Sequence, residues 1–164
     1  MDVEYMNSRA KRYQFLSTLF RDEIPLELIK AMQKDEFLDG FNESVTGCGF
    51  LDLINGAEVM TRCLKSNDAE KLQKELSYDY ADIFLNAGAN PVFPYESCHV
   101  TGDPVVMQEP VFKLREYFRK AGVQKNPEFK DLEDHIAVQL EYLRYVLEKG
   151  NEELYKDFFK KKYT

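Results

Sequence analysis

The sequence predicts an all-α fold: a single-domain helical bundle over residues 1–164 with one long proline-containing loop. Two observations predict the helices. Apolar residues recur at helical spacing along most of the chain, and no alternating apolar–polar run is long enough for a strand. The loop is predicted over residues 87–108, where helix breakers are too frequent for a continuous element: Gly88, Pro91, Pro94, Gly102 and Pro104.

Two helices are predicted near the N-terminus, followed by a segment that stays open. Val3 to Phe20 carries an apolar stripe at helical spacing. Pro25 suits the first position of a short helix through about Met32, because the missing N–H of proline needs no partner there. Residues 34–47 are mixed and contain two glycines, so they form either a short helix or a loop.

Two more helices precede the long loop. Phe50 to Leu64 repeats the helical pattern. Asn67 is the predicted N-cap of the next helix, and Glu70 three residues later completes a capping box. This helix continues to about Leu85.

Three helices are predicted after the loop. Helical spacing resumes at Val111 and closes at Gly122. A long helix is expected over 132–147 with Asp131 as its cap. The last helix begins at Asn151, where the glutamates that follow favour the positive end of the helix dipole.

Composition excludes several classes of function. The net charge of −7 argues against a nucleic-acid partner, because phosphate binding draws on an excess of Lys and Arg. No apolar run approaches the ~20 residues that span a bilayer, and the first residues lack an export signal, so we expect no stable membrane insertion. Three cysteines without metal-ligand spacing favour a reducing cytoplasm: Cys48, Cys63 and Cys98.

The loop segment Pro91–Ser97 combines prolines, aromatic residues and one acid. Glu96 directly follows Pro94 and Tyr95, where a carboxylate is either exposed or paired. Arginine is the natural partner for such a carboxylate, because its planar guanidinium donates two parallel hydrogen bonds. A simpler interpretation stays open, in which the prolines and aromatic side chains only pin the loop to the core.

Asp134 and His135 form a second polar group near the start of the predicted 132–147 helix. Asp134 fits a capping or helix-dipole acid equally well, and His135 fits a half-buried packing histidine. In the functional interpretation the two side chains face the loop and bind a peptide backbone or an arginine.

The sequence contains no complete motif for an enzyme. Ser97 has His99 and His135 as candidate bases but lacks the Gly-x-Ser-x-Gly turn of a hydrolase. Glu96 and His99 have the spacing of half a metal site, which occurs only once. We therefore expect no enzyme, no metal and no cofactor. A small hydrolase, a metal-dependent enzyme and a generic helical protein-interaction scaffold remain the alternatives.

Two blocks of sequence resemble the TorD/DmsD/NarJ family of cytoplasmic chaperones for molybdoenzyme maturation. The first runs from Tyr78-Asp79-Tyr80-Ala81-Asp82-Ile83-Phe84-Leu85 to Pro91-Val92-Phe93-Pro94-Tyr95-Glu96-Ser97. The second is Glu133-Asp134-His135-Ile136-Ala137-Val138-Gln139-Leu140-Glu141-Tyr142-Leu143. The chain departs from the family at Glu133, where proline is frequent, and at Gln139, where glutamate is frequent.

The resemblance implies a non-enzymatic, all-helical chaperone. Such a protein binds the twin-arginine signal peptide of a molybdenum-cofactor oxidoreductase precursor and assists cofactor insertion before export. Its partners would be the signal peptide and the folded part of the precursor. Family members usually continue beyond the position of Thr164, so the resemblance implies either a short member or a bundle completed by a second copy, in a homodimer formed by helix exchange. The signal-peptide-binding residues carried over by the resemblance are Pro94, Tyr95, Glu96, Ser97, Asp134 and His135.

Overall fold

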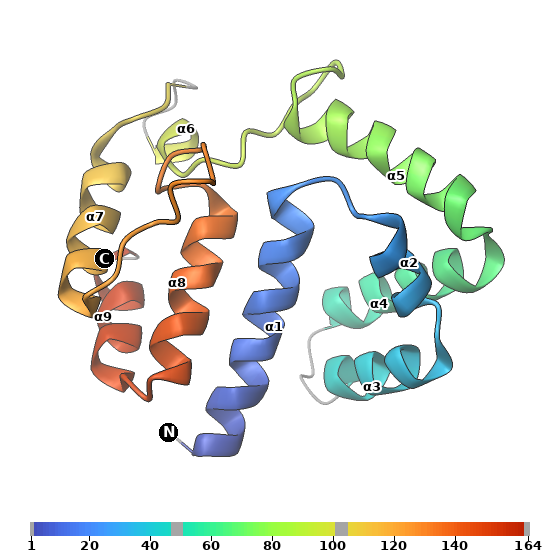
Figure 1. Ribbon diagram of the computed structural model, residues 1–164, viewed down its shortest axis with the longest axis horizontal. Coiled ribbons are helices and arrows are strands. Elements are labelled where there is room, and N and C mark those ends of the chain that lie inside the picture. The colour runs from blue at the N-terminus through green and yellow to red at the C-terminus, as the bar shows by residue number, and fades with distance from the viewer. Residues whose placement is uncertain (1, 47–50, 101–104, 163–164) are drawn as a thin grey trace. The chain divides into compact units, whose positions relative to one another are not determined.

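The computed structural model describes residues 2–46, 51–100 and 105–162. Over these residues the chain is helical and contains no strand, which confirms the predicted all-α class (Figure 1). The chain divides into two compact units, Met1–Asp22 with Pro91–Thr164 and Glu23–Asn90. The expectation of a single domain stays a prediction, and each unit has its own packing.

The first unit is centred on two antiparallel helices, α1 (Val3–Arg21) and α8 (Ile136–Glu148) (Figure 1). Small side chains let them approach closely: Ala10, Ser17 and Ala137 are all buried. The Ser17 hydroxyl donates a hydrogen bond of 2.9 Å to the carbonyl oxygen of Ala137. The N-terminal helix is therefore fixed to a segment 120 residues later.

Helices α7 (Glu109–Ala121) and α9 (Glu152–Lys162) complete this core. The rings of Tyr117, Tyr142 and Phe158 lie with centroids 5.3 to 5.9 Å apart in tilted pairs, the arrangement that aromatic quadrupoles favour. Both predicted ends are confirmed: Gly122 closes α7 in the left-handed region at φ 68°, and Asn151 Oδ1 accepts from the backbone N–H of Leu154.

The second unit contains α2 (Leu26–Met32), α3 (Asp35–Thr46), α4 (Leu51–Ser66) and α5 (Ala69–Phe84). The open segment 34–47 is thus a helix as far as Thr46, and Gly47 lies outside the described residues, as does Phe50. Pro25 precedes its helix as the N-cap and is not its first residue.

The predicted cap of α5 was wrong by one residue. Asp68 is the N-cap, and its Oδ1 accepts from the backbone N–H groups of Glu70 and Lys71 at 3.0 and 3.1 Å. The Asn67 side chain instead donates to the carbonyl oxygen of Cys63 in the preceding helix. Its amide nitrogen therefore satisfies a carbonyl group at the end of the preceding helix, and the cap of α5 comes from Asp68.

The predicted start of the long helix was also wrong. Helix α8 begins at Ile136, and its N-cap is His135, not Asp131. The N–H of Ile136 donates to the carbonyl oxygen of Pro94 at 2.8 Å, so the backbone just before α8 pairs with the loop. We call residues 131–135 the strap.

The long loop is confirmed as irregular over its described residues, apart from the four-residue helix α6 (Ser97–Val100). Residues 101–104 lie outside the described part of the chain. Among the described helices, none is long and apolar enough to cross a membrane.

Candidate functional site

Two main-chain hydrogen bonds join the loop to the strap. The N–H of Glu96 donates to the carbonyl oxygen of Asp134 at 3.1 Å, and the N–H of Ile136 donates to that of Pro94 at 2.8 Å. Tyr95 and His135 therefore form an isolated antiparallel bridge, and their rings meet edge to face at 5.2 Å. The structure thus brings together the two segments that the sequence singled out.

Asp134 and Ser97 lie beneath this bridge and are both 0% exposed. Asp134 Oδ2 accepts from the backbone N–H of Ser97 at 2.8 Å, at the start of α6. The Ser97 hydroxyl oxygen accepts from the N–H of Gln108 at 3.1 Å. Both side chains hold the loop in place, and neither reaches the surface. A fully buried Ser97 disfavours the hydrolase alternative.

His135 is 3% exposed and acts as a structural cap. Its Nδ1 accepts from the backbone N–H of Ala137 at 3.1 Å, which requires that nitrogen to be unprotonated. Burial lowers the pKa of His135, although Asp131 and Asp134 act in the opposite direction. The imidazole is therefore held neutral inside the protein.

Tyr95 and Pro94 are half-buried. The Tyr95 hydroxyl donates to Asp131 Oδ1 in the strap. Burial, together with this hydrogen bond and the charge of Asp131, raises the pKa of Tyr95. The phenol stays protonated, and its ring serves as a second tie between the loop and the strap.

A bidentate ion pair secures the other side of the strap. Arg115 on α7 donates to both carboxylate oxygens of Glu133, at 2.9 and 3.2 Å. Burial alone would raise the pKa of Glu133, but the hydrogen bonds and charge of Arg115, together with a backbone hydrogen bond and the charge of Lys125, lower it. The sequence interpretation noted Glu133 only as a departure from the family and missed this pair.

Glu96 is the acid of the loop that keeps access to solvent. It is half-buried, and its Oε2 accepts from Gln139 Nε2 at 3.2 Å. The same nitrogen of Gln139 donates to the carbonyl oxygen of Asp134 at 2.8 Å. One buried amide therefore orients Glu96 and secures the strap. The sequence interpretation did not assign this role to Gln139.

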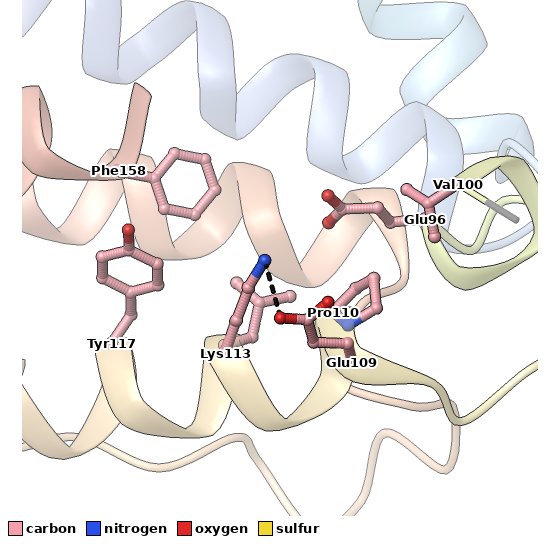
Figure 2. Close-up of a pocket in the computed structure, with 8 residues that line it drawn as sticks. Glu96, Val100, Glu109, Pro110, Lys113, Tyr117 and Phe158 are labelled. Carbon is pink, nitrogen blue, oxygen red and sulfur yellow. Dashed lines mark ion pairs between the residues drawn. The ribbon is translucent and has the colours of Figure 1, made fainter. Parts of the chain in front are cut away.

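Glu96 borders a cavity of about 150 Å³ between the loop, α7 and α9 (Figure 2). In this view the Glu96 carboxylate lies at one end, and the rings of Tyr117 and Phe158 lie at the other. Between them, Lys113 Nζ pairs with Glu109 at 3.1 Å. The full lining is Glu96, Val100, Glu109, Pro110, Lys113, Leu114, Tyr117 and Phe158.

Sequence reasoning missed most of this lining. Glu109, Lys113 and Tyr117 are spaced four residues apart, so they share one face of α7, and that periodicity was the available signal. Phe158 comes from the last helix and had no such signal. Only the folded core brings it beside Tyr117.

The electrostatics of the cavity favour a cation. Two glutamates and one lysine line it, so its formal charge is negative. Burial raises the pKa of Tyr117, and the charges of Asp157, Glu116 and Glu96 raise it further. A flat cation can contact a carboxylate and an aromatic face at the same time, and guanidinium has that shape.

The remaining candidates for metal or nucleophilic chemistry are engaged in structural contacts. His99 Nε2 lies 2.7 Å from the carbonyl oxygen of Phe93. Cys98 is buried, and burial with the charge of Asp134 raises the pKa of its thiol. Over residues 2–46, 51–100 and 105–162, no three His, Cys, Asp or Glu side chains are grouped as metal ligands.

Comparisons with known proteins give a consistent result. The family model described as nitrate reductase delta subunit matches residues 51–163. The chaperone protein TorD of Vibrio vulnificus strain YJ016 is 31% identical over 155 residues, covering 90% of this chain and 68% of its own length. The chaperone protein TorD of Vibrio atlanticus is 28% identical over 151 residues, with the same coverage.

One solved structure is also similar. It is that of a proposed redox enzyme maturation protein from Archaeoglobus fulgidus, 22% identical in sequence. The match covers 91% of this chain and 75% of that one, with a TM-score of 0.49.

Proposed function

Since this chain belongs to the family of the nitrate reductase delta subunit and the TorD chaperones, we propose that it binds the twin-arginine signal peptide of a molybdenum-cofactor oxidoreductase precursor. In this proposal the chain has no catalytic activity. It holds the precursor in the cytoplasm while the cofactor is inserted, and the folded part of the precursor makes a second contact. Dimerisation by helix exchange stays a prediction, to be tested by sedimentation.

The observation that carries the proposal is the position of Glu96. Its carboxylate borders a solvent-open cavity with aromatic rings at the far end (Figure 2). An arginine entering this cavity would pair with Glu96 while its guanidinium contacts the face of Tyr117 or Phe158. Both interactions discriminate arginine from lysine, because only the guanidinium is planar and bidentate.

The other five residues carried over from the family support Glu96 in different ways. Pro94 accepts one main-chain hydrogen bond of the bridge, and Tyr95 ties the loop to the strap. Ser97, Asp134 and His135 are buried, so we propose that they position the loop from beneath and do not contact the peptide. An interface of this kind depends on preorganisation, since a fixed loop loses little conformational freedom when the peptide binds.

Calorimetric titration of the full chain with a twin-arginine peptide tests the proposal. We expect binding, and we expect Glu96→Gln to weaken it at least about tenfold, because a hydrogen bond to a charged group is worth about 1.5–3 kcal/mol. Glu128→Gln is the matched control, since it removes the same charge from an exposed turn outside the cavity lining. Absence of binding, or equal losses in the two variants, would contradict the proposal.

A further inference from the structure

We infer that the cavity beside Glu96 takes one arginine of the pair, so that the two arginines of the peptide are not equivalent, and that this arginine displaces Lys113. The inference rests on the proposed function. It adds the number of arginines that enter the cavity and names the residue with which the arginine competes.

The size of the cavity limits the number of arginine side chains that it can hold. Pockets for drug-sized ligands measure about 300–1,000 Å³, whereas this cavity measures about 150 Å³. A cavity of about 150 Å³ in a protein interior accommodates one benzene ring. Benzene has as many heavy atoms as an arginine side chain beyond its Cβ. There is room for one guanidinium and its stem, and none for a second.

The charge of the cavity also limits the number of arginine side chains to one. Glu96 and Glu109 contribute two negative charges and Lys113 one positive charge, which leaves a formal charge of −1. When one guanidinium replaces Lys113 and contacts both carboxylates, the formal charge stays at −1. A second cation would have to share the same two carboxylates with the first in so small a space, which adds repulsion.

Lys113 is the group that an incoming arginine meets. Its Nζ pairs with Glu109 at 3.1 Å, and Figure 2 shows this pair between Glu96 and the aromatic rings. Both side chains of the pair are more than half exposed, at 55% for Lys113 and 76% for Glu109, and exposed pairs at this helical spacing are weak. The guanidinium therefore competes with Lys113 for Glu109 at little cost.

Four peptides that differ only at the pair test the first part: Arg-Arg, Lys-Arg, Arg-Lys and Lys-Lys, each titrated into the full chain. We expect one single replacement to weaken binding about tenfold, close to the loss for Lys-Lys, and the other to change it by less than about threefold. Equal losses at the two positions, or no loss at either, would overturn the inference and leave the proposed function intact. Failure of the Arg-Arg peptide to bind would overturn the proposed function itself.

A pair of variants on one helix tests the second part. Lys113→Ala removes the competing cation, and we expect it to tighten binding of the Arg-Arg peptide about threefold relative to Arg119→Ala. Arg119 is an exposed cation on the same helix and lies outside the cavity lining, so it controls for the general charge of the protein. Circular dichroism checks that both variants keep their helix content. Equal affinities for the two variants would overturn the role of Lys113.

Discussion

At the scale of single residues, the chemical type of a side chain was easier to predict than its surroundings. The sequence offered both Glu96 and Asp134 as partners for an arginine, with a capping role left open for Asp134. The structure separates them, because Glu96 borders an open cavity whereas Asp134 is fully buried and accepts from the N–H of Ser97. Burial of this kind depends on a contact between segments 37 residues apart, which local sequence does not encode.

The cap at His135 makes the stability of the fold depend on pH. The ordinary pKa of histidine is 6.5, and burial lowers that of His135 in the folded state. The unfolded chain therefore takes up its proton first as the pH falls. We expect the stabilisation to be complete above pH 6.5 and to be lost progressively as the pH falls from there through the lowered pKa. Urea unfolding at a series of pH values between 7.5 and 5 measures this.

Two histidine variants separate this effect from other titrations. Asn is also a good N-cap and does not titrate here, so His135→Asn should flatten the dependence between pH 6.5 and 5. His99→Asn removes the other histidine and is the matched control. A wild-type slope in His135→Asn would show that the cap is not the source.

Asp134 offers a second test at this scale. Asp134→Ala removes the acceptor for the Ser97 N–H and leaves that donor buried, so we expect it to lower the free energy of unfolding by about 2 kcal/mol. Asp134→Asn keeps an oxygen acceptor of the same shape, and we expect it to lose clearly less. Thermal or urea unfolding of both variants measures the difference, and equal losses would contradict the assigned hydrogen bond.

At the scale of helices, periodicity predicted where the helices lie, and the errors fell at their ends. The apolar stripes were a useful signal because several of their residues pack in a core, although others, such as Leu16 of α1 and Phe112 of α7, are exposed. The starts of α5 and α8 were wrong because several polar residues compete to cap a helix. Asn67 bonds backwards to Cys63, and Asp131 accepts from Tyr95. Neither contact can be predicted from the neighbouring sequence alone.

The close contact of α1 with α8 predicts a position-specific cost. Ser17→Leu loses the hydrogen bond to Ala137 and forces a large side chain between two helices, so we expect it to lower the free energy of unfolding by about 3 kcal/mol. Ser8→Leu is the same substitution on the exposed face of the same helix and should change it by less than about 0.5 kcal/mol. Similar losses in both variants would contradict the packing described here.

At the scale of the whole molecule, the first unit is built from the two ends of the sequence. Residues 1–22 supply α1, and residues 91–164 supply the remaining helices of the unit. The sequence shows that α1 is amphipathic but not which helix it covers, because a partner 120 residues away leaves no local trace. This long-range pairing was the part of the fold that periodicity could not predict.

A fragment experiment follows from this construction. The segment 91–162 alone lacks the helix that covers α8, so we expect it to unfold without a cooperative transition. Adding a peptide of residues 2–22 should restore helical circular dichroism and a transition. The same peptide carrying Ala10→Glu should not, because that position is 2% exposed in the folded core. A cooperative transition in the fragment alone would contradict this account.

The bridge between Tyr95 and His135 has a consequence for engineering. Its two hydrogen bonds run between main-chain atoms, so they do not depend on the type of side chain at position 96. Residue 96 can therefore be substituted while the bridge is kept. Glu96→Arg would place a basic group at the opening of the cavity and suit signal peptides that carry a pair of acidic residues. Under the proposed function, the side chain at this one position would then determine which peptide is preferred.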